Sequence, residues 1–242
     1  MKKQLSLLVL LAALLLAACS NNEGDENKQE KDTTNDTVSM EDTQKELEAM
    51  KVEADSVVAT VNGEEIRGKD YNTMLVQTQL RYTMEGKDPS KNETAETIKQ
   101  EVMDNLIGQE LLLQKAKEEG FTASDKEVEA ELSQVKSQFE SEEQLQEALK
   151  AQGITLEQYE RQLANIVVVD KYVEENVETP EVTEEEMKAF YDEQFTKDAD
   201  NPPSYDEMKD RIKSYLEETK LQKKVQELRN ELNEKAEIEE MI

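Results

Sequence analysis

The sequence predicts a mainly α-helical domain with a small β-sheet that joins the two ends of the domain. Three observations predict this fold class: apolar residues recur at helical spacing, capping motifs mark the helix starts, and strand-like runs lie near both ends of the folded region. One apolar stripe runs through Val128, Leu132, Val135 and Phe139, which share one face of a helix. Similar stripes recur within residues 159–167 and 221–232.

The expected helix starts carry a hydroxyl residue followed three positions later by Glu or Gln. This is the pattern of a capping box, in which both side chains accept free backbone N–H groups of the first turn. The pairs are Ser124/Glu127, Ser141/Gln144, Thr155/Gln158, Thr183/Glu186 and Ser204/Glu207. Gly120 and Gly153 lie where two of these helices are expected to end.

Two segments are candidates for strands that pair across the domain. The run from Val57 to Val61 is rich in β-branched residues, and Asn62-Gly63 follows it as a strong hairpin-turn signal. Residues 64–66 are expected to return as a short second strand or to lead directly into a helix. Residues 236–241 are expected to form a closing strand, and because short strands are unstable alone, we expect this segment to pair with residues 57–61.

One helix is expected at the centre of the fold. Its apolar residues cover a wider arc than a surface helix shows, and such a helix is typically surrounded by others. These residues are Ile98, Val102, Met103, Leu106, Ile107, Leu111, Leu112 and Leu113.

The N-terminus has the features of a bacterial lipoprotein signal. A short basic start precedes the apolar run from Leu5 to Leu16, which is shorter than the roughly 20 residues of a membrane-spanning helix. The string Leu16-Ala17-Ala18-Cys19 resembles the lipobox, in which the signal is cut between Ala18 and Cys19 and the thiol carries a diacylglycerol. We therefore expect a signal peptide over residues 1–18 and a lipid anchor, with acyl chains such as palmitate, at Cys19. An ordinary signal peptide or a free cysteine is the alternative.

The segment after this cysteine is expected to be a tether. Residues 19–54 are highly charged and almost lack apolar side chains before Leu47, a composition typical of disordered chains. We expect this acidic tether to hold a folded domain, residues 55–242, away from the membrane. Residues 46–52 are a candidate for the start of a helix.

Composition excludes several functions. With 29 Lys and Arg against 57 Asp and Glu, the formal net charge is −28, which disfavours nucleic-acid binding and attachment to anionic lipids through a basic patch. Histidine is absent and Cys19 is the only cysteine, so Ser-His-Asp and Cys-His catalysis, histidine-based zinc sites and internal disulfides are excluded. We expect no cofactor and no metal. Carboxylates are abundant, so chemistry that uses paired acids stays open.

Several segments, taken in order, resemble the SurA/PrsA-type extracytoplasmic chaperones. The string from Val58 to Ile66 resembles the strand that opens this family, and the block from Leu111 to Gly120 is similar to its next helix. Ser137-Gln138-Phe139 and the residues from Glu147 to Thr155 are similar to the following helices. The block from Val182 to Tyr191 matches the segment that leads into a parvulin-type prolyl isomerase domain. The resemblance covers about residues 55–242 and implies a helical chaperone fold of the SurA N-domain type.

The sequence departs from the family pattern where the isomerase domain is expected. Only residues 192–203 separate Tyr191 from the last long helix, and a domain needs about 50 residues or more. The family's isomerase site also uses histidines, which this chain lacks. No catalytic residue is therefore carried over from the family.

The resemblance implies binding of unfolded or newly exported polypeptides, which needs exposed and adaptable apolar side chains. The candidates for client contacts are Tyr82, Met84, Phe190, Tyr191 and Phe195. Of these, Tyr82, Met84 and Phe195 lie near expected helix ends or loops and are expected at the surface, whereas Phe139 belongs to an apolar stripe and is expected in the core. For any one of these side chains, burial in the core is the alternative.

The leading hypothesis is a lipid-anchored chaperone on the extracytoplasmic face of the cell membrane, acting without ATP. PrsA-like lipoproteins point to a Gram-positive bacterium. Two alternatives stay open: an interaction lipoprotein that binds one dedicated partner, and a prolyl isomerase that lacks the usual domain. The oligomeric state and the identity of clients do not follow from the sequence.

Overall fold

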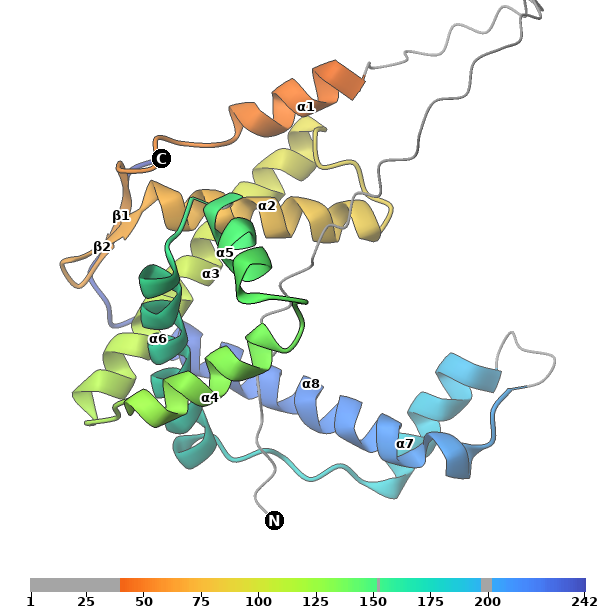
Figure 1. The fold of residues 1–242 in the computed structure, drawn as a ribbon. Coiled ribbons are helices and arrows are strands. Elements are labelled where there is room, and N and C mark those ends of the chain that lie inside the picture. Colours follow the sequence, from red (N-terminus) through yellow and green to blue (C-terminus); the bar gives the residue numbers. More distant parts are fainter. Residues whose placement is uncertain (1–39, 152, 197–201) are drawn as a thin grey trace, which may run out of the picture.

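The computed structural model describes residues 40–151, 153–196 and 202–242 (Figure 1). Within these ranges the chain forms eight α-helices, one π-helical turn and one three-stranded sheet, which confirms the predicted mainly α fold with a small sheet. The first elements are α1 (Met40–Ala49), β1 (Val57–Val61), β2 (Glu64–Arg67), α2 (Gly68–Met84), α3 (Asn92–Glu118) and α4 (Asp125–Lys136). They are followed by α5 (Glu142–Ala151), α6 (Leu156–Asn176), α7 (Glu184–Tyr191), the π-helical turn η1 (Asp192–Thr196), α8 (Tyr205–Asn233) and β3 (Ile238–Glu240).

The sheet joins the two ends of the described chain, as predicted. Its strand order is β2-β1-β3, and both pairings are antiparallel. Asn62 and Gly63 form the hairpin turn with φ values of 52° and 87°, a region that these residue types tolerate. β3 is shorter than the predicted segment 236–241, but the pairing continues at both ends. The Asn62 N–H donates to the carbonyl of Glu237 (2.8 Å), and the Met241 N–H donates to the carbonyl of Val58 (2.9 Å).

Helix α3 lies at the centre of the fold, as its broad apolar arc predicted. All eight of the expected core residues are buried: Ile98, Val102, Met103, Leu106, Ile107, Leu111, Leu112 and Leu113. The N-terminal and middle parts of α3 pack with β1 and α2 in one apolar cluster. Its C-terminal part packs with α6 and α8 in a second cluster, and α4, α5 and α6 share a third. One long helix therefore connects the sheet to the rest of the bundle.

The capping motifs mark the helix starts correctly. Reciprocal capping boxes are present at Ser124, Thr155, Thr183 and Ser204, at the starts of α4, α6, α7 and α8. At α5 the box is displaced by one residue. Ser141 Oγ accepts the N–H of Gln144 (3.2 Å), but the Gln144 side chain accepts the N–H of Glu140 (3.0 Å). The two glycines expected at helix ends, Gly120 and Gly153, have positive φ.

The folded region begins before residue 55, which corrects the predicted extent of the tether. Residues 40–49 form α1, Met50 is buried, and Leu47 and Val52 pack against the same cluster. The Asn72 side chain holds this segment, because it accepts the Val52 N–H (3.0 Å) and donates to the Val52 carbonyl (2.7 Å). Although the segment is highly charged on average, its few apolar side chains, Leu47, Met50 and Val52, are enough to pack it against the core. Residues 1–39, with Ala18, Cys19 and most of the predicted tether, lie outside the described residues.

The N-terminal segment passes so close to the start of α2 that residue 68 has to be a glycine. A Cβ at Gly68 would lie 2.1 Å from the carbonyl oxygen of Glu53 and 2.9 Å from a methyl group of Val52. The Gly68 N–H also donates to the carbonyl of Ser56 (2.8 Å). Any side chain at this position would therefore push the backbone segments apart.

Helix α7 lies beside the N-terminal half of α8, away from α1, α2 and the sheet (Figure 1). We refer to α7, η1 and residues 205–220 of α8 as the arm. Met187 on α7 and Ile212 on α8 are its buried apolar side chains. Within the described ranges, no helix combines the length and apolar character that crossing a bilayer requires.

Candidate functional site

Five aromatic rings gather at the end of the arm, and three of them are predicted client contacts. We call this set the aromatic cluster: Phe190, Tyr191, Phe195, Tyr205 and Tyr215. The structure thus brings together Phe190, Tyr191 and Phe195 and adds two tyrosines of α8. The cluster is formed where the end of α7, the π-helical turn η1 and α8 meet.

The rings contact one another in a continuous series. Phe190 lies 5.1 Å from Tyr215 and 6.5 Å from Phe195, measured between ring centroids. Tyr191 stacks on Phe195 at 5.8 Å and meets Tyr205 edge to face at 5.4 Å. These spacings are in the range in which aromatic pairs attract each other. The cluster is therefore an ordered surface, in which the rings support one another.

Two tyrosine hydroxyls of the cluster are used for internal hydrogen bonds. The Tyr191 hydroxyl donates to the carbonyl of Pro203 (2.7 Å), and the Tyr205 hydroxyl donates to a carboxylate oxygen of Glu184 (3.0 Å). Both bonds connect α7 or its end with the start of α8. The ring faces are partly covered as well, since Tyr191 stacks on Phe195 and the ammonium groups of Lys188 and Lys209 lie 5.9 and 5.8 Å from the centroid of the Tyr205 ring.

Ion pairs hold α7 against α8. Glu184 pairs with Lys209 (2.8 Å), and Lys220 donates to Glu186 (2.7 Å) and to the carbonyl of Glu181 (2.7 Å). The Lys220 bond, followed by the bonds from the backbone N–H and hydroxyl of Thr183, lowers the pKa of Glu186 to about 2. The Lys209 bond likewise lowers the pKa of Glu184. The arm is thus fixed by charged groups around a small apolar contact.

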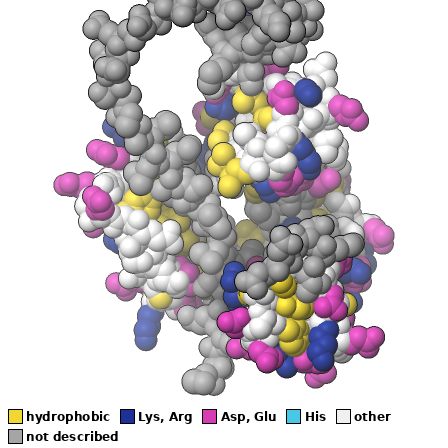
Figure 2. Space-filling view, turned by 90° about the vertical axis from the view of Figure 1, so that its right-hand side faces the viewer, with side chains coloured by type: hydrophobic (Ala, Val, Ile, Leu, Met, Phe, Trp, Pro, Cys, Tyr) yellow, Lys and Arg dark blue, Asp and Glu magenta, His cyan; other side chains and the backbone are white. Residues whose placement is uncertain are grey.

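The aromatic cluster is partly open to solvent. Tyr215 is 54% exposed, and the other four rings are half-buried. Figure 2 views the molecule from the side on which the arm lies in Figure 1, and on that face hydrophobic side chains surface in separate bands bordered by acidic and basic side chains. Aromatic rings presented among charges offer a large contact area together with a soluble surface.

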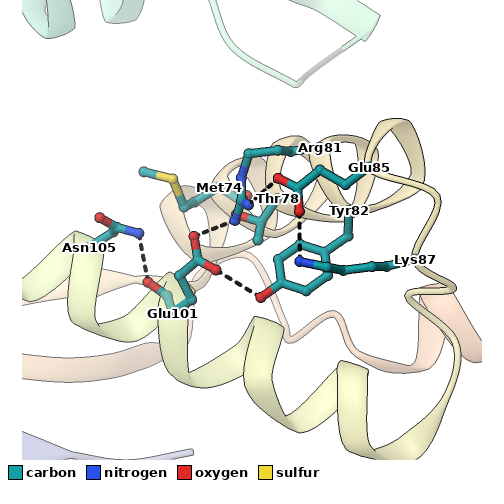
Figure 3. Close-up of polar contacts among 8 residues, drawn as sticks. All are labelled: Met74, Thr78, Arg81, Tyr82, Glu85, Lys87, Glu101 and Asn105. Atoms are coloured by element: carbon teal, nitrogen blue, oxygen red, sulfur yellow. Dashed lines mark hydrogen bonds and ion pairs between the residues drawn. The ribbon is translucent and has the colours of Figure 1, made fainter. Parts of the chain in front are cut away.

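Tyr82 is buried, which corrects its expected place at the surface. The residue is 8% exposed and belongs to the main core cluster. Its hydroxyl donates to Glu101 on α3 (3.1 Å), and its ring lies 4.7 Å from both the Arg81 guanidinium and the Lys87 ammonium (Figure 3). Although Tyr82 lies near the end of α2, it turns toward α3, because that helix supplies both an apolar surface and an acceptor.

The charged groups around Tyr82 form a clasp between α2 and α3. Arg81 bonds Glu85 (2.9 Å) and also bonds Glu101, while Lys87 bonds Glu85 (2.7 Å) (Figure 3). Both carboxylates thus have cationic partners, and the pKa of Glu85 is lowered, first by the Lys87 bond and then by the Arg81 bond. This network has the character of a structural contact.

The remaining two predictions about single residues have different outcomes. Met84 is 81% exposed, so it is available for contact, but it lies on α2, far along the chain from the aromatic cluster. Phe139 packs against the cluster formed by α4, α5 and α6, as its stripe predicted. The structure therefore separates the five predicted client contacts into three residues of the arm, one exposed methionine and one core tyrosine.

One carboxyl group has a strongly raised pKa. Burial of Asp170 on α6, followed by the negative charge of Glu131 on α4, raises its pKa to about 7. Asp170 lies on the helix that packs against α4, so the shift follows from helix packing. In the described residues, no group of three or more His, Cys, Asp and Glu side chains is placed to hold a metal ion.

Sequence reasoning missed Tyr205 and Tyr215, although a signal for them is present. Tyr205, Met208, Ile212 and Tyr215 recur at i, i+3, i+7 and i+10, so they share one face of α8. Ile212 at the middle of this stripe is buried, whereas Tyr215 at its end is exposed. Reading this stripe together with the Phe190-Tyr191 pair would have found the complete cluster.

The central helix, the sheet and the arm together form a mainly helical fold, and comparison with known proteins shows the family to which it belongs. The model of the SurA-like N-terminal domain matches residues 38–173, which is more than half of the chain. The chain therefore belongs to the SurA-like N-terminal domain family, and the predicted resemblance to SurA/PrsA-type chaperones is confirmed.

Curated relatives carry the name foldase protein PrsA. The protein of Caldanaerobacter subterraneus subsp. tengcongensis is 33% identical over 145 residues, which are 57% of this chain and 42% of that protein. Those of Clostridium botulinum strains Langeland and 657 are 27% and 26% identical over 185 and 187 residues, in each case 71% of this chain and 55% of the relative. The matches thus cover about half the length of these relatives.

Proposed function

We propose that the chain is a lipid-anchored chaperone that binds unfolded, exported polypeptides through the aromatic cluster and acts without ATP. The observation that carries the proposal is the cluster itself: five rings in mutual contact, partly open to solvent, at the end of an arm away from the sheet. Membership of a chaperone family supports this reading. Unfolded chains expose apolar side chains without fixed geometry, and a set of rings can contact many such sequences.

The arm suits transient binding of this kind. Phe and Tyr rings bury large areas and lose little conformational freedom, since they have few rotatable bonds. The charges around the cluster keep the free surface soluble and limit the size of the apolar patch. Such a surface favours many weak contacts with different polypeptides over one precise fit.

Cys19 is proposed as the point of attachment to the membrane. The apolar run and the lipobox-like string support this proposal, as does the excess of negative charge, which disfavours attachment to anionic lipids through a basic patch. Residues 19–39 would then separate α1 from the anchor, and the clients would be chains emerging on the extracytoplasmic face.

The function is tested by two assays on one preparation of the full chain. The first follows aggregation of a chemically denatured model client by light scattering, and the second follows a refolding reaction limited by prolyl isomerisation. We expect suppressed aggregation without ATP and an unchanged refolding rate. Unaffected aggregation would contradict the chaperone proposal. Faster refolding would instead favour an isomerase, and stable co-purification of a single partner without general client binding would favour a dedicated interaction lipoprotein.

The anchor is tested separately by fractionating cells that express the Cys19→Ala variant. We expect the wild-type chain in the membrane fraction and the variant outside it. Retention of the variant in the membrane fraction at the wild-type level would contradict lipid attachment at this residue.

A further inference from the structure

The outer edge of β3 is open to another strand. β3 pairs with β1 on one side, and in the described part of the chain the sheet ends at β3 on the other. The carbonyl of Glu237 bonds to Asn62, directly after β1, and the N–H of Met241 bonds to Val58 of β1. Hydrogen-bonding direction alternates along a strand. The residues between them, Ile238 and Glu240, therefore direct their N–H and C=O groups away from β1. These groups are the ones that an added strand would bond.

Little covers this edge from above or below. The side chains of Glu239 and Glu240, which point to opposite faces of the sheet, are both exposed. Met241 and Ile242 are 51% and 55% exposed, while Ile238 is half-buried against the core. An incoming segment would meet backbone groups along the strand and two apolar side chains beyond it.

The negative charge along the outer edge of β3 favours a positively charged binding partner. Residues 234–242 contain four glutamates and one lysine: Glu234, Glu237, Glu239, Glu240 and Lys235. Antiparallel pairing of two copies of β3 would bring glutamates of one copy against those of the other, and like charges that face each other across strands are destabilising. A segment with Lys or Arg at alternate positions would instead form favourable cross-strand pairs.

We propose that the outer edge of β3 binds an extended, positively charged polypeptide segment as a fourth antiparallel or parallel strand of the sheet. Main-chain hydrogen bonds to Ile238 and Glu240 would supply affinity for any extended chain, and Glu239 and Glu240 would select basic side chains. This surface is distinct from the aromatic cluster. The two lie at opposite ends of α8, whose 29 residues span about 43 Å at 1.5 Å per residue. The proposal therefore does not depend on client binding at the arm.

Glu240→Pro tests the main-chain contact directly. Proline removes the outward N–H of residue 240 and leaves the bonds of β3 to β1 in place, since edge strands tolerate proline where the N–H faces solvent. Glu240→Thr is the matched control, because it removes the same charge but keeps the N–H and the extended conformation. The probe is a fluorescent synthetic peptide with alternating valine and lysine, and the measurement is its anisotropy on titration with the full chain.

We expect Glu240→Pro to weaken peptide binding by about tenfold or more, and Glu240→Thr by roughly twofold to fivefold, as for a single exposed ion pair. A peptide with glutamate in place of lysine is expected to bind at least about tenfold more weakly than the parent, since charges of like sign then meet. Thermal unfolding of each variant shows whether the sheet is intact.

A test that leaves the protein unchanged uses the same peptide with alternate backbone amides N-methylated. We expect binding to be lost, because the methyl groups block hydrogen bonds along one edge of the peptide. Equal binding of the parent and N-methylated peptides would overturn the proposal, as would wild-type affinity in a folded Glu240→Pro variant. Absence of binding to the wild-type chain would also overturn it, and so would self-association of the wild-type chain that Glu240→Pro abolishes.

Discussion

Tyrosine side chains are buried in one region of the molecule and exposed in another. We call β1, β2, β3 and α2 the sheet region and compare it with the arm. Tyr71 and Tyr82 of α2 are almost completely buried in the core cluster that also contains β1, whereas Tyr205 and Tyr215 of the arm remain partly or largely exposed. The sheet region uses aromatic side chains to close a core. The arm uses them to keep an apolar surface open. The buried and the exposed tyrosines therefore belong to different regions of the molecule.

The polar contacts of the sheet region connect segments that are far apart in the sequence, whereas those of the arm connect neighbouring helices. In the sheet region, side chains connect segments that are distant in sequence: Asn62 donates to Gln114 (2.9 Å) and accepts the N–H of Glu237 (2.9 Å). In the arm, exposed ion pairs such as Lys209 with Glu184 connect two helices of one hairpin. Exposed pairs contribute little individually, so the arm is expected to open more easily than the sheet region.

The largest expected effect is on the sheet region. Gly68→Ala should lower the free energy of unfolding by roughly 3 kcal/mol, since its Cβ would lie 2.1 Å from the carbonyl oxygen of Glu53. Gly108→Ala is the matched control in the central helix, because its Cβ would lie 2.9 Å from Cδ of the Arg229 side chain and not against a backbone atom. Urea unfolding of both variants measures the difference. A milder effect of Gly68→Ala than of Gly108→Ala would contradict the close approach.

The next effect depends on pH and concerns the packing of α4 on α6. Burial raises the pKa of Asp170 in the folded chain to about 7, so the folded state binds this proton more tightly than the unfolded state does. Stability should therefore fall as pH rises from about 4 to 7. Asp170→Asn should stabilise the chain by about 1–2 kcal/mol above pH 7, since water still screens part of the charge. The gain should vanish near pH 4.

Thermal unfolding across this pH range checks that prediction, and Glu131→Gln is the control. Removing the charge of Glu131 should give a smaller gain of the same sign, because burial is the first cause of the raised pKa and this charge the second. A gain in Asp170→Asn that is independent of pH would show that the carboxyl group is not the origin of the effect.

A smaller effect on stability but a clear one on activity is expected in the arm. The double variant Phe195→Ala/Tyr215→Ala should weaken suppression of client aggregation by about fivefold or more, as expected when central aromatic contacts are removed from a binding surface. Its unfolding midpoint should stay close to that of the wild type, because both rings are partly exposed. Val76→Ala is the control, since Val76 is also exposed (46%) but lies on α2. Equal losses in both variants would contradict a specific role for the cluster.

The smallest expected effect is on the start of α7. Thr183→Ala removes a helix cap and should cost about 1 kcal/mol locally. The same contact depends on pH, because the bonds of Glu186 lower its pKa to about 2 in the folded chain. Its contribution is complete above the unfolded pKa of about 4.3 and is lost as pH falls toward 2. Hydrogen exchange should show faster exchange in α7 at low pH and in the variant, with α3 unchanged.

The sequence predicted the features that are locally encoded. Capping pairs such as Thr183/Glu186 act within one turn, and the apolar arc of α3 requires surrounding partners wherever they come from. The closing strand was also found, because its counterpart at residues 57–61 is a clear signal.

The parts that sequence reasoning missed depend on tertiary contacts. Tyr82 and Phe195 both lie near helix ends, but Tyr82 packs in the core cluster and bonds Glu101 on α3, whereas Phe195 is half-buried in the arm. The bounds of α1 were missed: residues 46–52 were a candidate for the start of a helix, whereas α1 spans Met40–Ala49 and docks through the stripe around Leu47 and Met50. Whether a side chain is buried depends on which other element packs against it. The spacing of residues within one segment does not specify that element.

The central claim, that the aromatic cluster of the arm contacts unfolded clients, is tested most directly by site-specific photo-crosslinking. A benzophenone amino acid is placed at Tyr215 in one variant and at Val76 in another, and each full chain is irradiated with a denatured client. We predict strong crosslinks to the client from position 215 and weak ones from position 76. Crosslinks of equal yield, or a yield that is higher from position 76, would contradict the account.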